Sequence, residues 1–293
     1  MPELPEVETV RTGLEKAWLG RTITKVILRR PNLRYPFPED FENRLVGHKI
    51  IAIRRRAKYL LIDTDSDLVF LSHLGMSGKY TIFDAQKVSQ YDLDIPDSKS
   101  AFGAMSGFDG RHDHMEIRFD DGSVSVYTDP RRFGIVKLFH RAEQEIQPLL
   151  SVLGPEPFDD WNAQIAAKRC RGKRSPIKTT LLDQRFVVGV GNIYACEALH
   201  TAGIAPTKLA AQLVTKAGKP TKALEKLVEE IKDFEIYISK VNKLTSNEWK
   251  QPFGDGNSSE KIVNDLIELS STDTFNKHNR NDYAYDVSNA FKE

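Results

Sequence analysis

Short runs rich in β-branched and aromatic residues follow one another between about residues 20 and 140. Gly, Asp and Asn separate several of these runs, which is typical of short strands joined by turns. The predicted strands are 23–28, 50–54, 59–62, 68–72, 80–83, 115–119, 124–128 and 135–139. Many short strands at this spacing favour a β-sandwich or a barrel-like domain. The polar stretch 84–110 contains Gly103, Gly107 and Gly110 and predicts a loop or insertion.

Apolar residues recur at helical spacing on both sides of this β-rich region. The first helix is expected to begin near Pro5, because proline is tolerated in the first helical turn. Its apolar face consists of Val7, Val10, Leu14 and Trp18. Helical spacing returns from 158 to about 245. The sequence therefore predicts an α+β fold, with a β-rich domain at 1–148 and a helical domain at 149–245. Residues 246–293 form a third segment, rich in Asn, Ser, Asp and Lys.

Composition limits the classes of protein that fit. The 293 residues are enough for one large or two ordinary domains, and the net charge of +1 excludes a polycation. Basic clusters occur at 54–58 and 168–174, but a charge run is usually a solvated face and is weak evidence for an anionic partner. Cys170 and Cys196 form no CxxC pair, and no signal peptide or long apolar span is present. We expect a soluble, intracellular protein.

The first residues, Met1-Pro2-Glu3-Leu4-Pro5-Glu6, carry candidate chemistry. If Met1 is removed, the nitrogen of Pro2 becomes a secondary amine with a pKa of about 7.7–8.0, so part of it is unprotonated at neutral pH. Such an amine attacks electrophilic carbon and forms Schiff bases. Glu3 and Glu6 could move protons around it. The alternative is a loose acidic tip, against which the predicted helix argues.

A second candidate lies at Gly189-Val190-Gly191-Asn192, after an apolar run. The glycines allow close backbone approach, and a helix that begins near Asn192 would point its N–H groups outward, which is a phosphate-binding geometry. The preceding basic run and Lys178 support this interpretation. The alternative is that the glycines form only a turn before a helix.

Two turns present residues that could contact nucleic acid. The stretch 71–78 contains His73 and Met76, and the stretch 128–134 contains Arg131 and Phe133. Met76 and Phe133 would ordinarily be core residues. At exposed loop tips, however, such side chains can enter between bases, which enzymes that act on a base inside a duplex require.

Seven sequence words, in order over residues 1–206, make the chain resemble the formamidopyrimidine-DNA glycosylase (Fpg/Nei) family. They are MPELPEVETVR at 1–11, RRAKYLL at 55–61, HLGMSG at 73–78, YTDPRRFG at 127–134, LGPEP at 153–157, VVGVGNIYACEAL at 187–199 and AGI.P at 202–206. The resemblance implies an N-terminal antiparallel β-sandwich and a helix–two-turn–helix domain, with damaged duplex DNA bound between them. It also implies a monomer. We expect no membrane partner, since the chain has no long apolar span, and no cofactor.

The resemblance assigns catalytic roles to four residues. Pro2 would attack the sugar C1′ of a damaged nucleotide and release the base, and β- and δ-elimination would then cut the strand. Glu3 would give a proton to the opening sugar, Glu6 would assist, and Lys58 would hold a phosphate beside the flipped nucleotide.

The resemblance also assigns DNA contacts. His73 and Asn192 would contact the backbone, and Lys178 would lie near the lesion pocket. The residues that fill the space left by the flipped base would be Met76, Arg131 and Phe133.

The chain departs from many bacterial members in one respect. No cysteine follows Cys196, so a four-cysteine zinc finger cannot form. The chain thus resembles the plant and fungal branch, whose finger is a metal-free hairpin, and a nuclear location would follow for a eukaryotic protein. Arg280 is the candidate for the finger arginine, and a solvent-exposed loop arginine is its alternative. The stretch between Trp249 and Ser259 matches poorly, which leaves the range of oxidised purines open, including 8-oxoguanine.

Two functions remain after this comparison of motifs, since a third, a nucleic-acid module with a coincidental N-terminus, would require the ordered motifs to be accidental. The first is a bifunctional glycosylase and abasic-site lyase, which the presence of Pro2, Glu3 and Lys58 favours. The second is a catalytically silent protein of the same fold that binds damaged DNA.

Overall fold

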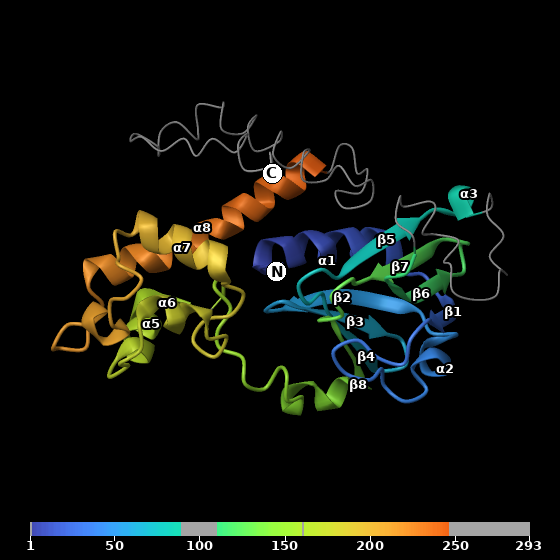
Figure 1. The fold of residues 1–293 in the computed structure, drawn as a ribbon, viewed down its shortest axis with the longest axis horizontal. Coiled ribbons are helices and arrows are strands. Elements are labelled where there is room, and N and C mark those ends of the chain that lie inside the picture. The colour runs from blue at the N-terminus through green and yellow to red at the C-terminus, as the bar shows by residue number, and fades with distance from the viewer. Residues whose placement is uncertain (1, 89–109, 160, 246–293) are drawn as a thin grey trace. The chain divides into compact units, whose positions relative to one another are not determined.

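A computed structural model describes residues 2–88, 110–159 and 161–245, with side chains as far as residue 233 (Figure 1). The fold is α+β, as predicted. Strands occupy the first part of the chain, drawn in blue to green in Figure 1, and helices occupy the part drawn in yellow to orange. None of the described helices has both the length and the apolar character needed to cross a bilayer.

The strands form two antiparallel sheets of four strands each, in the orders β1-β6-β7-β5 and β2-β3-β4-β8. The strands of the first sheet are β1 (Ile23–Leu28), β5 (Lys79–Phe83), β6 (Asp113–Phe119) and β7 (Val124–Thr128). Those of the second are β2 (Ile50–Arg56), β3 (Tyr59–Thr64), β4 (Leu68–His73) and β8 (Ile135–His140). Buried side chains of both sheets share one core, for example Val26 and Ile117 with Ile62 and Phe70. The predicted sandwich is therefore correct.

Helix α1 (Leu4–Trp18) packs on this core with the face that the sequence predicted. Val7, Leu14 and Trp18 belong to the shared core and are at most 2% exposed. Glu3 is the N-cap, and its backbone N–H donates to the Glu6 carboxylate at 2.9 Å. This capping box begins the helix. Glu3 and Leu4 are each 3% exposed, so the start of the chain is not a loose tip.

The helical part has its own core. The helices of this part are α5 (Ala163–Cys170), α6 (Ile177–Leu182), α7 (Asn192–Thr201) and α8 (Lys222–Thr245). Trp161, Leu181, Leu199 and Leu227 are among its buried members. Two short 3-10 helices, η1 (Arg141–Ile146) and η2 (Ala210–Leu213), complete the elements of residues 135–245.

Several boundaries and short elements differ from the sequence prediction. The eight strands occur where expected, and three of them extend two residues beyond the predicted ends: β2, β3 and β6. The region predicted as a loop at 84–110 begins with one short helix, α3 (Ala85–Val88), and residues 89–109 lie outside the described residues. Helix α2 (Phe41–Leu45) was not predicted, because five residues carry too little periodicity.

Candidate active site

The carboxylate of Glu3 is docked on the N-terminus of α7. Its Oε2 accepts hydrogen bonds from the backbone N–H groups of Gly191 at 2.8 Å and Tyr194 at 3.2 Å, and its Oε1 accepts one from Ile193 at 2.9 Å. The positive end of the helix dipole adds to these bonds in favouring negative charge there. The start of the chain is thereby fixed against residues that lie about 190 positions later.

The two glycines before α7 let the start of the chain approach. A Cβ on Gly191 would lie 2.3 Å from the Glu3 carboxyl carbon, and a Cβ on Gly189 would lie 2.2 Å from a Leu4 methyl carbon. Gly189 also has a φ of +83°, which favours glycine. The predicted helix near Asn192 is present. The expectation that its N–H groups would bind phosphate is wrong for Gly191, Ile193 and Tyr194, since Glu3 occupies them.

Lys58 lies in the turn between β2 and β3 and is 4% exposed. Its Nζ donates to the Val190 carbonyl at 3.3 Å, so it lies beside the same loop as Glu3. Burial lowers the pKa of the Lys58 ammonium, and the carboxylates of Glu3 and Glu6 act in the opposite direction. The fold thus places a buried cation next to the start of α1.

Glu6 joins the same group of side chains. Besides its bond to the Glu3 N–H, its Oε1 accepts a hydrogen bond from the Tyr194 hydroxyl at 3.2 Å. Pro2 directly precedes this cluster and is half-buried. The structure therefore brings together the four residues that the sequence selected for catalysis: Pro2, Glu3, Glu6 and Lys58.

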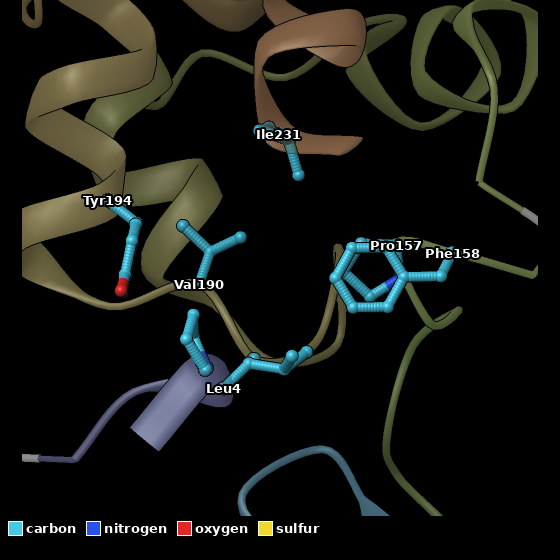
Figure 2. Close-up of a pocket in the computed structure, with 8 residues that line it drawn as sticks. Leu4, Pro157, Phe158, Val190, Tyr194 and Ile231 are labelled. Carbon is cyan, nitrogen blue, oxygen red and sulfur yellow. The ribbon is translucent and has the colours of Figure 1, made fainter. Parts of the chain in front are cut away.

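An apolar pocket adjoins the docked start of the chain (Figure 2). It is lined by Leu4, Pro5, Pro157, Phe158, Gly189, Val190, Tyr194 and Ile231. These residues come from α1, the 157–158 segment, the loop before α7, and helices α7 and α8. Apolar side chains of several elements thus surround the point where Leu4 meets Gly189.

His73 ends β4 and is half-buried. Its Nδ1 accepts the Gly75 N–H at 3.0 Å, and its ring lies 4.9 Å from the Tyr59 ring. Burial, together with the charges of Lys58 and Arg34, lowers the pKa of His73 to about 4. At neutral pH the imidazole is therefore neutral, with its proton on Nε2, where it can donate to an acceptor.

Met76, Arg131 and Phe133 are presented at the tips of two adjoining loops. Met76 is 40% exposed and Phe133 is 41% exposed, so neither is an ordinary core residue. The Arg131 guanidinium lies 4.9 Å from the centre of the Phe133 ring. The exposure of all three side chains fits the prediction that they contact a ligand.

Asp129 holds these two loops together. This fully buried carboxylate accepts the Ser77 hydroxyl at 2.6 Å and the Gly134 N–H at 2.8 Å. The Ser77 hydroxyl in turn accepts the Arg131 N–H at 3.1 Å. A Cβ on Gly75 would lie 2.4 Å from the Phe133 carbonyl carbon, so the loops are in direct contact.

The three arginines of the basic run at 54–58 pair with carboxylates within the fold, so they do not form a solvated cationic face. Arg54 pairs with the buried Asp63 at 2.6 Å. Arg55 and Arg56 pair with Glu156 at 2.9 and 2.8 Å. Glu156 also accepts the Ala57 N–H at 2.7 Å. Burial would raise the pKa of Glu156, but the Arg55 charge and these hydrogen bonds leave the pKa lowered.

The remaining predicted residues lie in the helical part. Asn192 is exposed at the start of α7, and Lys178 is half-buried in α6. In the second basic run, Lys168, Arg169, Arg171 and Arg174 are all exposed, and Arg169 donates to the Arg185 carbonyl at 2.7 Å. Arg280 lies outside the described residues, as does the segment predicted to form a finger.

Sequence reasoning missed three residues that shape the site: Asp129, Glu156 and Gln184. Gln184 accepts the Gly189 N–H at 2.8 Å and donates to the Val190 carbonyl at 3.0 Å. Asp129 and Glu156 lie within the family motifs YTDPRRFG and LGPEP, so these motifs could have pointed to them. No comparable signal pointed to Gln184.

Comparison with family models identifies the class of protein that this fold and cluster define. Residues 1–136 match the formamidopyrimidine-DNA glycosylase N-terminal domain, and residues 153–234 match the formamidopyrimidine-DNA glycosylase H2TH domain. The chain belongs to the formamidopyrimidine-DNA glycosylase family.

Individual relatives agree with this assignment. The chain is 47% identical over 234 residues to the formamidopyrimidine-DNA glycosylase of Rhodopseudomonas palustris, which covers 79% of this chain and 77% of the relative. It is 46% identical over 237 residues to that of Agrobacterium fabrum, covering 80% and 78%. Both relatives are bacterial, so they give no support to the plant and fungal branch or to a nuclear location.

Solved structures give the same result. Lactococcus lactis Fpg in complex with abasic-site DNA aligns with a TM-score of 0.67 and 31% identity, over 87% of this chain and 84% of that one. MutM in complex with carbocyclic 8-oxo-G containing DNA aligns with a TM-score of 0.65 and 33% identity, over 83% and 81%.

Proposed function

We propose that this protein is a base excision repair enzyme that removes oxidised purines from duplex DNA and then cleaves the strand at the abasic site. The observation that carries the proposal is the docking of Glu3 on α7, which puts the start of the chain beside the buried ammonium of Lys58. The relatives named as formamidopyrimidine-DNA glycosylases, and the solved complexes with damaged DNA, support it.

The chemistry begins at Pro2 once Met1 has been removed. The Pro2 nitrogen attacks C1′ of the damaged nucleotide, and the bond from C1′ to the base breaks. The sugar ring then opens: the C1′–O4′ bond breaks, O4′ takes up a proton, and an iminium ion forms between Pro2 and C1′. The iminium acidifies the neighbouring sugar hydrogen, so β-elimination and then δ-elimination cut the strand on both sides. This sequence needs a group that donates a proton to the opening sugar and groups that remove protons.

Glu3 is the proton donor in this proposal. The three N–H groups that hold its carboxyl stabilise the carboxylate that remains after the proton has left. Glu6, held by Tyr194, assists nearby. Lys58 binds a phosphate beside the flipped nucleotide, as a cation in a buried cleft can.

The DNA-binding set consists of residues with accessible polar or apolar tips. His73 offers an Nε2–H to the backbone, and Asn192 is exposed at the start of α7. Lys178 lies nearer the lesion in this proposal. The void-filling residues are Met76, Arg131 and Phe133, whose exposure supports the role.

The finer assignments concern domains, the finger and location. We infer a catalytic domain at 1–148 and an H2TH domain at 149–245, which the matched ranges 1–136 and 153–234 support. Residues 246–293 would form a metal-free finger as in the plant and fungal branch, with Arg280 on a phosphate. The absence of cysteines after Cys196 supports this part. The protein would act inside the cell as a monomer, in the nucleus if the source is eukaryotic.

Borohydride trapping tests the central step. On a duplex with an abasic site or an oxidised purine, we expect a covalent adduct through Pro2, in protein whose intact mass lacks Met1. Acetylation of the N-terminus should abolish the adduct, whereas Pro2→Gly need not, because glycine also offers an amine. Strong trapping after complete acetylation would exclude Pro2 as the nucleophile. Tight binding with no adduct would identify the silent binder instead.

Metal analysis tests the finger. We expect purified protein to contain no stoichiometric zinc and to keep its activity in a chelator. One zinc per chain would overturn the metal-free assignment without affecting the role of Pro2.

A further inference from the structure

The Val190 carbonyl is shared by two donors from different parts of the chain. Lys58 Nζ donates to it at 3.3 Å, and Gln184 Nε2 donates to it at 3.0 Å. The Oε1 of Gln184 accepts the N–H of Gly189 at 2.8 Å. One amide side chain therefore holds two consecutive residues of the loop before α7.

Lys58 is held loosely for a buried cation. The bond to Val190 is the one hydrogen bond of its ammonium within the described residues, where it forms no ion pair. At 3.3 Å this bond is longer than the usual range of about 2.7–3.2 Å. An ammonium has three donor hydrogens. Because only one of these three hydrogens has an acceptor here, the Lys58 ammonium can donate to an anionic oxygen as well or instead.

Turning away would leave the Val190 carbonyl with one donor fewer. Val190 is 3% exposed, and a buried carbonyl without a partner is costly. Gln184 removes that cost, since it already binds the same oxygen at 3.0 Å. Val190 is also followed by Gly191, whose N–H binds Glu3, so a shift of this carbonyl would disturb the Glu3 docking.

We propose that Gln184 is a positioning residue: it keeps the Val190 carbonyl bonded and in place while Lys58 transfers its hydrogen bond to a DNA phosphate. This inference rests on the proposed function, in which Lys58 binds phosphate. It assigns to Gln184 a contribution to DNA affinity although its side chain contacts only the protein backbone.

The variant Gln184→Glu removes the side-chain N–H that donates to the Val190 carbonyl and keeps the acceptor oxygen. Glutamate can still accept the Gly189 N–H, but it offers no N–H to the Val190 carbonyl. Gln212→Glu is the matched control, because the Gln212 Oε1 also accepts a backbone N–H, that of Leu209 at 3.2 Å. Gln184→Met, which adds no charge, serves as the second variant, and thermal melting verifies that each protein is folded.

Binding is measured by fluorescence anisotropy on a duplex with a tetrahydrofuran abasic analogue over a range of salt concentrations. We expect Gln184→Glu to weaken binding about tenfold. The slope of log K against log salt should become shallower by about 0.9, as for the loss of one phosphate contact. Gln212→Glu should leave both quantities at the wild-type values.

A double-mutant cycle with Lys58→Met decides the mechanism. If Gln184 acts through Lys58, Gln184→Glu should weaken binding no further once Lys58 is gone. Additive losses would mean that the new charge simply repels DNA, or that the loop is damaged, and would overturn the inference. Wild-type affinity and slope in both Gln184 variants would overturn it too. If the wild-type protein itself gives no borohydride adduct and no binding, the proposed function fails instead.

Discussion

Gly189 shows how a single residue without a side chain can determine the position of the Glu3 carboxylate, the proposed proton donor. Leu4 packs where the Cβ of any other residue would lie, and the Leu4 N–H donates to the Gly189 carbonyl at 3.2 Å. Glu3, one residue earlier, is then within reach of α7. The glycine is needed for close packing of the protein against itself.

Gly189→Ala should therefore lower the free energy of unfolding by more than the strain of placing alanine in a left-handed backbone conformation would. Gly172 is the matched control, since its φ of +74° resembles the +83° of Gly189 but no atom lies within 4 Å of its Cβ position. We expect about 1–2 kcal/mol of destabilisation for Gly172→Ala and about 1–3 kcal/mol more for Gly189→Ala. Urea unfolding measures both, and only Gly189→Ala should reduce borohydride trapping. Equal losses in the two variants would contradict the Leu4 contact.

His73 should make stability depend on pH. The unfolded chain takes up a proton on this side chain below pH 6.5, whereas the folded protein does so only near pH 4. Stability therefore falls as the pH falls through this window, because the unfolded state binds the extra proton.

The comparison of wild type with His73→Gln isolates this effect, since the other titrating groups are common to both proteins. Between pH 7 and pH 5, urea unfolding should show wild type losing about 2 kcal/mol more than the variant. Parallel pH profiles would show that His73 titrates alike in the folded and unfolded states.

At the scale of elements, the 73–78 and 129–134 loops behave as one unit because Asp129 bonds to both. The carboxylate contacts Ser77 in one loop and Gly134 in the other. The link fixes the backbone of the two loops that present Met76, Arg131 and Phe133.

Asp129→Ala should leave the Gly134 N–H without its acceptor and lower stability by about 2–3 kcal/mol. It should also reduce discrimination between lesion-containing and undamaged duplex, because the side chains that we propose to fill the void lose the support of this link. Asp120→Ala, at an exposed aspartate of the same domain, is the control. Anisotropy on the two duplexes measures the ratio of affinities, and an unchanged ratio would contradict the role of the link.

Local patterns predicted the elements well and their contacts poorly. The β-prone runs gave all eight strands, because β-branched and aromatic residues between turn residues mark a strand over five or six positions. The run at 54–56 looked like a cationic surface, yet its acidic partners Asp63 and Glu156 come from other segments. The N–H groups of α7 looked open because Glu3, which fills them, lies about 190 residues earlier in the chain. Because the partners lie far apart in the sequence, local patterns could not show these pairings.

Across the molecule, Glu156 connects the β-rich part to the helical part. It binds Arg55 and Arg56 of β2. Gly154, which lies two residues before Glu156 in the chain, donates its N–H to the Gln184 carbonyl at 2.8 Å. The 153–157 segment thereby touches both the turn that carries Lys58 and the loop that carries Gln184. It is a structural part of the site as well as a connection between two cores.

Glu156→Gln should weaken this connection. The carboxylate is lost while two guanidinium groups stay in place, which we expect to cost about 3 kcal/mol. Unfolding in urea should become broader or biphasic, as the two cores lose their coupling. Glu145→Gln, at an exposed glutamate, should unfold like the wild type. A single sharp transition at the wild-type midpoint in Glu156→Gln would contradict this prediction.

The docking of Glu3 also has a consequence for how the chain is made. Residues 191–194, which hold its carboxylate, leave the ribosome long after Glu3 does. At about 5–20 residues per second, the delay is roughly 10–40 s. During that interval the first residues are accessible to the enzymes that trim and modify nascent chains. In the proposed function Met1 must be removed, and this interval, before Glu3 can dock on α7, is the time at which its excision is least hindered.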